Sequence, residues 1–550
     1  MRKDTHNLWL LRLCVLTLAL TFLVTGCGDT PTPESSAGTP STEASTTSGS
    51  SGTTTDSSTT ESTGSTVTTG ATTGSTTTAK PTTGSPSKTT KVTTTAKPTT
   101  TKKPLPALTI YPVAKELADN VKGTQHTVKV NGKNSFVYQS EVTIRSGYVT
   151  GFAEYTAFDF HGSVTVEVTA HYAVASVEIL PSRDNIAFKQ EGNTVTFTLT
   201  EPGQLFVKIN GDHTNGNSAP HPLYIFANPP EENIPSKSDP NVVYFEPGVY
   251  YHQTYYLESN TTYYLAPGAF VYGRFYGHSL ENVTICGRGT LCGEELTSMG
   301  DDGRTICIKN AKNVTVEGIQ VMDPKVWTVA FYQSKDIHVD NIMTISHGQS
   351  ADGIDICGSQ DVLVENSFFR GHDDMLAVKP CTMSDYENPV PCKDIVFRNC
   401  VVWCDSSNPM TIGYETVGDV NNVLYECIDV LNQSKSPVWK LEAIMAIEPH
   451  YKGTVDGVIY RDIRIDLALD SDPENLVRFV IDNGSGTIRN IRVENVFVNY
   501  GGLMKGTIAG STRAPDVENI TFVNVRNSEG VKMTLDDLVI NSLVKNVTVE

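Results

Sequence analysis

Positive charge is scarce in this chain. Its 550 residues contain 42 Lys and Arg against 61 Asp and Glu, which gives a formal net charge of −19. Such an acidic protein repels nucleic acid and other polyanions, so we expect no nucleic-acid partner. The sequence has no CxxC pair, which argues against a structural zinc site, and we expect no metal or cofactor. Hydrophobic residues make up only 39% of the chain. That share is low for a helical bundle but normal for thin, strand-rich folds.

The sequence also lacks an apolar run that would comfortably span a membrane. The run Leu13 to Val24 is short and contains two threonines, and basic residues precede it. It leads into Leu23-Val24-Thr25-Gly26-Cys27, which resembles the bacterial lipobox. We therefore predict a signal peptide over residues 1–27 and a diacylated Cys27 that anchors an extracellular, monomeric protein to the bacterial membrane. The alternative is an ordinary signal peptide with an incidental cysteine.

Composition divides the remaining chain into three regions. Residues 28–104 are mostly Ser, Thr, Gly and Pro, which cannot bury a core, so we expect a disordered linker. Residues 105–232 contain short alternating runs, such as Val164-Thr-Val-Glu-Val-Thr-Ala, separated by turn residues. This pattern predicts a β-sandwich domain. Residues 233–550 are predicted to form the catalytic domain.

A repeat runs through this last region. Each unit is an Asn or Asp followed by apolar-x-apolar, as in Asn282-Val-Thr-Ile, Asn313-Val-Thr-Val and Asp361-Val-Leu-Val. The spacing of 23 to 35 residues matches the coil of a parallel β-helix. We expect the corner Asn or Asp to adopt left-handed backbone and to hydrogen-bond the neighbouring coil. The apolar positions should stack in one column, which contains Val283, Val314, Ile337, Val362, Ile395 and Val423. The predicted fold class is all-β, with a right-handed parallel β-helix preceded by a β-sandwich.

Cysteine pairing stays open at this stage. Beyond Cys14 and Cys27, nine of the 11 cysteines lie between Cys286 and Cys427. An odd number leaves at least one free thiol. Local disulfides within Cys381/Cys392 and Cys400/Cys404, or cysteines buried in the stacks, are both compatible with the spacing.

Two acidic stretches interrupt the repeat. They are Ser350-Ala-Asp-Gly-Ile-Asp-Ile and Arg370-Gly-His-Asp-Asp-Met-Leu. Asp352 and Asp373 are 21 residues apart, close to one coil, so we expect their side chains on adjacent rungs of one face. Neighbouring carboxylates raise one another's pKa, which separates a general acid from a general base. A solvated turn or a calcium site is the alternative for these residues alone.

The motifs around these stretches resemble glycoside hydrolases of the pectin-lyase-like β-helix superfamily. Ala351-Asp-Gly-Ile-Asp-Ile, His372-Asp-Asp and Asn408-Pro-Met-Thr-Ile-Gly carry the resemblance. Family 28, the polygalacturonases, has a Gly-His-Gly and an Arg-Ile-Lys element. Here Asn408 stands where that His would be, and the second region reads Met445-Ala446-Ile447. Family 49, the dextranases and isopullulanases, lacks both elements and has an N-terminal β-sandwich. Residues 105–550 are therefore more similar to family 49.

The resemblance implies inverting hydrolysis of a polysaccharide. Asp373 would be the general acid, while Asp352 and Asp374 would activate water across a gap of roughly 6.5–9.5 Å. Lys379 would hold Asp374 ionised and bind a hydroxyl, or would form only a surface ion pair. Further substrate-binding candidates are His372, Asn408, Glu415 and the possible sugar-stacking aromatics Trp327 and Tyr414. His347 and His450 are additional candidates for substrate hydrogen bonds.

The missing cations favour a neutral α-glucan, such as dextran, as the substrate. A uronate carboxylate would find no obvious partner, unless Lys379, Arg370 or Lys440 supplied the charge from other coils. Alternatives are a polygalacturonase-like hydrolase of pectic polysaccharide, a polysaccharide lyase, and a non-catalytic glycan-binding surface β-helix. The aspartate spacing argues against the last of these.

Overall fold

The computed structural model shows strands and turns with very little helix. It describes residues 105–145, 149–211, 220–297, 303–381, 389–433, 442–466, 475–481, 485–499, 505–511 and 517–550. All of these lie in one compact unit, Pro98–Glu550. The predicted signal peptide, the predicted lipidation site Cys27, the predicted linker and Lys440 lie outside the described residues. None of the helices within the described residues is long and apolar enough to cross a membrane.

The first part of the described chain forms two packed sheets. One sheet contains β1 (Leu108–Ile110), β4 (Tyr138–Arg145), β5 (Val149–Phe160), β7 (Val177–Leu180), β10 (Gly203–Ile209) and β11 (Leu223–Asn228). The other contains β2 (His126–Val130), β3 (Lys133–Ser135), β6 (Val164–Ala170), β8 (Phe188–Glu191) and β9 (Thr194–Leu199). Apolar and polar residues alternate along β6, and its buried valines share a core with Phe158 and Ile225 of the first sheet. The predicted β-sandwich is confirmed.

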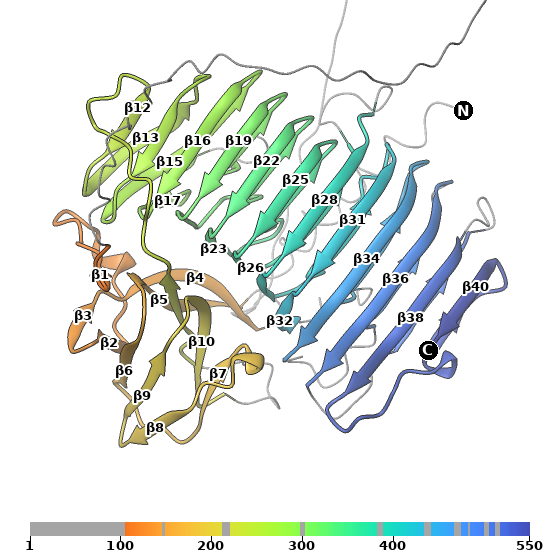
Figure 1. Cartoon of the computed structure of the whole chain (residues 1–550), viewed down its shortest axis with the longest axis horizontal. Coiled ribbons are helices and arrows are strands. Elements are labelled where there is room, and N and C mark those ends of the chain that lie inside the picture. Colours follow the sequence, from red (N-terminus) through yellow and green to blue (C-terminus); the bar gives the residue numbers. More distant parts are fainter. Residues whose placement is uncertain are drawn as a thin grey trace, which may run out of the picture. The chain divides into compact units, whose positions relative to one another are not determined.

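The second part is a parallel β-helix whose 29 described strands fall into three stacks. The ladder stack contains β12 (Val242–Phe245), β14 (Thr262–Leu265), β16 (Glu281–Gly287), β19 (Lys312–Glu317), β22 (Lys335–Asp340), β25 (Gln360–Glu365), β28 (Cys392–Arg398), β31 (Val420–Glu426), the first halves of β34 (Thr454–Ile465), β36 (Thr487–Val498) and β38 (Val517–Asn527), and β40 (Val544–Val549). Figure 1 shows many of these strands side by side in one direction.

The site stack holds the second strand type of each coil. It contains the C-terminal parts of β13 (Gly248–Tyr256) and β15 (Ala269–His278), then β18 (Ile306–Lys309), β21 (Val329–Tyr332), β24 (Ile354–Cys357), β27 (Leu376–Lys379), β30 (Met410–Tyr414), β33 (Met445–Pro449), β35 (Val477–Val480), β37 (Gly506–Ala509) and β39 (Leu538–Ile540).

The third stack contains the remaining strands. They are the N-terminal parts of β13 and β15, then β17 (Thr290–Cys292), β20 (Gln320–Met322), β23 (Met343–Ile345), β26 (Phe368–Gly371), β29 (Val401–Cys404), β32 (Asp429–Gln433) and the second halves of β34, β36 and β38. Short 3-10 turns are also present at η1 (Asp119–Val121), η2 (Ser182–Asp184) and η4 (Leu535–Asp537).

The predicted columns are confirmed residue by residue. Val283 pairs in register with Val314, and the same column continues through Ile337, Val362, Ile395 and Val423. All six side chains lie in the hydrophobic core. Because one coil cannot bury its own apolar strand, each rung is stabilised by its neighbours.

The corner residues also behave as predicted. Asn282, Asn313, Asp336 and Asp361 have φ angles of 57°, 57°, 57° and 54°. Asn313 Nδ2 donates to Asn282 Oδ1 over 2.8 Å, so the corner amides connect successive coils. Asn and Asp tolerate this left-handed backbone better than other side chains.

The nine cysteines of the β-helix are free thiols, and most are buried. Of the two possibilities left by the sequence, stacked buried cysteines are therefore what the structure shows.

Candidate active site

Alternation along the site stack decides which side chains leave the core. Ile354 and Ile356 of β24 point into the core, as do Leu376 and Val378 of β27. Side chains between them point to the opposite face. Asp355 and Lys379 therefore lie on the outer face of the site stack, where both are nevertheless buried.

A second column lies just before these strands. Trp327, Asp352, Asp374 and Asn408 each precede their site-stack strand by two residues. Backbone hydrogen bonds connect the coils there, including Gly353 N–H to the Asp374 carbonyl over 2.9 Å. The sequence analysis expected Asp352 beside Asp373, but Asp374 holds the equivalent position. Asp373 instead donates its backbone N–H to the Ala351 carbonyl over 3.3 Å.

Lys379 connects the carboxylates of two coils. Its Nζ donates to Asp352 Oδ2 over 2.6 Å and lies 2.9 Å from Asp355 Oδ1 and 3.9 Å from Asp374 Oδ2. The Lys379 side chain is only 5% exposed, so this is not the surface ion pair that the sequence left open. A buried cation with several buried carboxylates forms a unit in which no member can be removed without leaving unpaired charge.

Asp374 is held from its other side by neutral groups. Its Oδ1 accepts hydrogen bonds from Ser407 Oγ over 2.8 Å and from Asn408 Nδ2 over 3.0 Å. Asn408 is itself fixed, because its Oδ1 accepts from the Ala443 backbone N–H over 2.9 Å. Asp373 is more accessible than Asp352 or Asp374. Its Oδ1 accepts from the Asp374 backbone N–H over 3.0 Å.

Burial shifts the acidities of this cluster. Burial, together with the neighbouring Asp355 charge, raises the pKa of Asp352 well above its ordinary value, while Lys379 opposes the shift. Burial and Asp373 raise the pKa of Asp374 to about 7. Burial raises the pKa of Asp355 to about 6, while Lys379 opposes the shift. Burial alone would lower the pKa of Lys379, but Asp352 and Asp355 outweigh it and raise it. Perturbed groups of this kind concentrate at functional sites.

Two aromatic candidates border the cluster. Lys379 Nζ lies 4.1 Å from the centre of the Trp327 ring and the Arg304 guanidinium lies 4.5 Å from it. This half-buried ring therefore stabilises cations of the site, and its predicted contact with sugar stays a prediction. Tyr414 packs edge-on against His450 at 4.4 Å between ring centres. Glu415 lies close enough to Lys379 to raise its pKa.

The sandwich fixes the segment that carries the aspartates. Arg370 is 1% exposed, and its Nη1 donates to the Tyr224 hydroxyl over 2.6 Å. Its Nη2 donates to the Thr143 carbonyl over 3.0 Å, so two sandwich strands hold the guanidinium just before His372. Burial lowers the pKa of His372 despite the opposing charge of Asp405. Arg370 therefore supplies no free cation for a substrate.

His347 also faces the sandwich. Its Nε2 lies 3.3 Å from Glu141 Oε2, and its Nδ1 lies 3.8 Å from Asp323 Oδ1. Burial raises the pKa of Asp323 to about 7. These contacts attach the loop between β23 and Asp352 to β4.

A second buried ion pair lies farther along the site stack. The sequence comparison placed the cation-bearing segment at Met445-Ala446-Ile447. Met445 and Ile447 point into the core, so the outward positions of β33 are Ala446 and Glu448. Glu448 Oε1 lies 2.5 Å from Arg478 Nε. Burial and the neighbouring Glu448 charge raise the pKa of Tyr414. An acidic residue therefore occupies this outward position, and the nearby arginine is paired with it.

The structure brings together most of the predicted site residues and adds several. Asp352, Asp373, Asp374, Lys379 and Asn408 converge. The sequence analysis missed Asp355, Ser407, Glu448 and Arg478. Asp355 could have been found, because it follows Asp352 at the first outward position of a predicted strand. Ser407 could have been noticed beside Asn408. The ion pair between Glu448 and Arg478 could not be predicted from the sequence, because the coils of the β-helix differ in length.

Comparisons with known proteins show what the whole chain is similar to. Residues 283–465 match the family model described as glycosyl hydrolases family 28. The chain is 23% identical over 435 residues to isopullulanase of Aspergillus niger, covering 69% of this chain and 72% of that protein. It is 27% identical over 170 residues to probable exopolygalacturonase B of Aspergillus fumigatus, covering 29% of this chain and 34% of that protein.

Among solved structures, Dex49A from Penicillium minioluteum has a similar fold. The TM-score is 0.56 at 15% identity, with 78% of this chain and 94% of that chain covered. The resemblance to families 49 and 28 inferred from the motifs is thus confirmed. The chain is a homologue of the β-helix glycoside hydrolases, related both to isopullulanase and to family 28.

Proposed function

We propose that the protein hydrolyses a neutral α-glucan, such as dextran or pullulan, with inversion at the anomeric carbon. The convergence of Asp352, Asp373 and Asp374 around Lys379 carries this proposal. Paired carboxyl groups that differ in burial can divide the work of acid and base.

In the proposed mechanism, Asp373 donates a proton to the glycosidic oxygen. It is the most accessible carboxyl group of the three, so it is the one best placed to meet a substrate. A water molecule attacks the anomeric carbon from the opposite face and transfers its proton to Asp374. Asp352, which is held by Lys379, orients the same water. Lys379 stabilises the ionised base, because its charge lowers the pKa of both Asp352 and Asp374.

The charges along the site stack support a neutral substrate. A polygalacturonate residue carries a carboxylate that must be paired with a cation when it is desolvated. Lys379 and Arg370 are both occupied by protein partners, and Glu448 pairs with Arg478. A uronate near β33 would approach the Glu448 carboxylate, whereas a hydroxyl can bind to either charge.

The names of the relatives support both candidate substrates, a neutral glucan and polygalacturonate. One relative is named isopullulanase and the other exopolygalacturonase. The longer match is to isopullulanase, and the missing cations support glucan as the substrate.

A side-by-side assay tests the proposal. The full chain is incubated with dextran, pullulan and polygalacturonate, and reducing ends are counted. Proton NMR of the first products then reports the anomeric form. We expect release from dextran or pullulan with inverted configuration. Faster cleavage of polygalacturonate would show that the protein is a pectic hydrolase and that the glucan assignment is wrong. Products with retained anomeric configuration would contradict direct attack by water.

We also propose that the enzyme acts outside the cell, attached through Cys27. The lipobox-like motif and the long Ser/Thr-rich segment after it support this placement. Cys27→Ser should release the protein from the membrane fraction in a bacterial host. Unchanged membrane association would contradict lipidation.

A further inference from the structure

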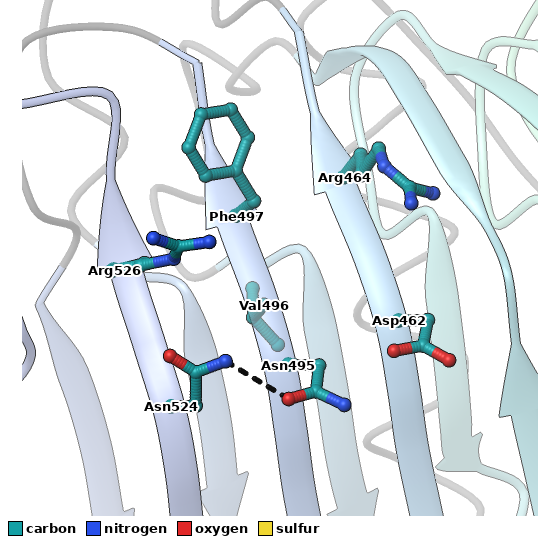
Figure 2. A pocket seen from close by; sticks show the side chains of 7 residues that line it. All are labelled: Asp462, Arg464, Asn495, Val496, Phe497, Asn524 and Arg526. Atoms are coloured by element: carbon teal, nitrogen blue, oxygen red, sulfur yellow. Dashed lines mark hydrogen bonds between the residues drawn. The ribbon is translucent and has the colours of Figure 1, made fainter. Parts of the chain in front are cut away.

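A hollow lies at one corner of the β-helix, away from the aspartates. Its volume is about 430 Å³. The side chains that line it come from β34, β36 and β38, and Figure 2 shows them from close by. The polar and aromatic members are Asp462, Arg464, Asn495, Phe497, Asn524 and Arg526. We call this hollow the corner trough.

Two columns of side chains build the corner trough. Arg464 pairs in register with Phe497, and Phe497 with Arg526, so the three lie on successive rungs. Figure 2 shows the Phe497 ring between the two guanidinium groups. The Arg526 guanidinium lies 5.8 Å from the ring centre.

The second column turns the corner. Asp462, Asn495 and Asn524 have φ angles of 56°, 55° and 52°. Asn524 Nδ2 donates to Asn495 Oδ1 over 3.0 Å. The left-handed backbone bends each strand at this point, so the side chains on both sides of the bend border one hollow.

The same outward column has a different character nearer the active site. Met343, Phe368 and Val401 are in register on successive coils. They are buried in a cluster with sandwich residues that include Phe206 and Tyr224. There the sandwich covers the column.

Beyond the sandwich-covered rungs the composition changes. The column continues from Val401 to Asp429 and then to Arg464. No sandwich residue is among the described residues that line the trough. An aromatic ring, Phe497, is half-buried there among charged and amide groups, and Arg526 is exposed.

We propose that the corner trough is a non-catalytic binding site for a neutral polysaccharide chain. The Phe497 ring offers an apolar surface for the C–H face of a pyranose. The guanidinium groups donate hydrogen bonds to hydroxyls, the Asp462 carboxylate accepts them, and the amides do both. Adjacent strands are about 4.8 Å apart, so the site from Arg464 to Arg526 spans about 10 Å, enough for more than one sugar ring.

Charge distinguishes this ligand from an acidic glycan. Asp462 lines the trough together with the two arginines, and a polyanion would meet that carboxylate. Arg464 also lies near the buried Asp429, whose pKa it lowers against the effect of burial. The choice of glucan rests on the proposed function, but the existence of the site does not.

The location gives the site a role in polymer binding. Asp374 lies just before β27, and the trough begins on β34, two coils farther along the β-helix. The trough belongs to the third stack, whereas the aspartates lie at the site stack. A polymer bound there would stay close to the aspartates between cleavage events. Short oligosaccharides would gain nothing from it.

Native affinity electrophoresis tests the proposal. The Asp373→Asn chain is run in gels that contain dextran, pullulan or polygalacturonate, alone and with Phe497→Ala or Arg526→Ala added. Arg489→Ala is the matched control, because Arg489 lies on β36 but outside the trough, where it pairs with Asp456. Phe497→Tyr keeps the ring and guards against a folding defect, which thermal melting also monitors.

We expect Phe497→Ala and Arg526→Ala to weaken retardation by dextran or pullulan at least fivefold. Phe497→Tyr and Arg489→Ala should keep it. In the active chain, Phe497→Ala should slow polymer hydrolysis but leave the hydrolysis of a trisaccharide unchanged.

Equal retardation of all variants would overturn the proposal, as would an equal loss in Arg489→Ala. A loss confined to polygalacturonate would show an acidic ligand and overturn the neutral one. If the unsubstituted chain cleaves none of the polymers, the proposed function is wrong. The gel result would still show whether the corner trough binds polysaccharide.

Discussion

Two of the columns that aspartate and asparagine occupy in this β-helix have different roles. In the ladder stack, Asn313 and Asp361 stand at exposed corners with left-handed backbone. Before the site stack, Asp352, Asp374 and Asn408 occupy equivalent positions on successive coils but are buried. The same residue types therefore shape the coil in one column and form a reactive cluster in the other.

The difference between the columns is their surroundings. Corner residues keep water on one side and hydrogen-bond one another, as in Asn422 Nδ2 to Asp394 Oδ1 over 2.6 Å. The carboxylates before the site stack have lost water, and burial raises the pKa of Asp374 to about 7. Repetition alone does not make a site, but burial of charge within the repeat does.

The largest effect should come from the same substitution made in each column. Asp374→Asn removes the proposed base, so turnover should fall at least about 10³-fold. Asp361→Asn changes a corner residue that keeps the same shape, and activity should stay within about twofold. The measurement is kcat on dextran or pullulan for both purified variants.

The melting temperatures of the Asp374→Asn and Asp361→Asn variants, measured as a function of pH, provide a second comparison of the two columns. Because burial raises the pKa of Asp374, the folded state holds its proton where the unfolded chain has lost it, and stability falls as pH rises from about 4 to about 7. Asp374→Asn should remove that part of the pH dependence. Equal activity losses in the two variants would end the distinction between the columns.

Removing the shared cation should have the next largest effect. Lys379→Met leaves Asp352 and Asp374 without the charge that lowers their pKa. Their pKa values should rise further, so the base ionises only at higher pH. We expect the acidic limb of the pH–rate profile to move upward and kcat at pH 6 to fall about 100-fold. An unmoved limb would show that Lys379 does not tune the base.

A smaller effect is expected at the outer ion pair. Glu448→Gln releases Arg478 from its partner while keeping the shape of the side chain. The ratio of polygalacturonate to dextran cleavage should rise about tenfold, since the freed guanidinium can bind a uronate carboxylate. Initial rates on both polymers measure the ratio. The double variant Glu448→Gln/Arg478→Gln should lose the gain, and a gain that persists would exclude Arg478 as its cause.

The smallest effect is expected at a single corner. Asn313→Ala removes one hydrogen bond of the ladder and places alanine at a φ of 57°. The cost should be about 1–2 kcal/mol of unfolding free energy, with kcat unchanged. Chemical denaturation gives the free energy, and Asn313→Gly, which accepts the backbone, should be less destabilised. A large loss of activity would mean that the two columns are coupled.

The features that recur in every coil could be predicted from the sequence. The column from Val283 to Val423 and the corner residues follow from a pattern that recurs in every coil, and each coil depends on its neighbour in the same way. The spacing of Asp352 and the Asp373-Asp374 pair placed them on adjacent coils for the same reason. The sandwich followed from period-two alternation in strands such as β6.

The remainder depends on contacts between segments of irregular length. Nothing in the spacing showed that Lys379 is buried among three carboxylates, or that Trp327 lies against it. Five apolar residues in a row, Ala443 to Ile447, gave no sign of which side chains of β33 face outward. The hydrogen bond from Arg370 to Tyr224 of the sandwich connects residues that are 146 positions apart along the chain, so no local pattern predicts it.

One measurement tests the central claim most directly: turnover of Asp373→Asn on whichever glucan the parent chain cleaves, with the melting temperature recorded on the same sample. Asp373 is the proposed proton donor and the most accessible of the three aspartates. We predict that turnover falls at least about 10³-fold while the melting temperature stays within about 2 °C. Near-normal turnover in a fully folded variant would contradict the assignment of this aspartate cluster as the active site.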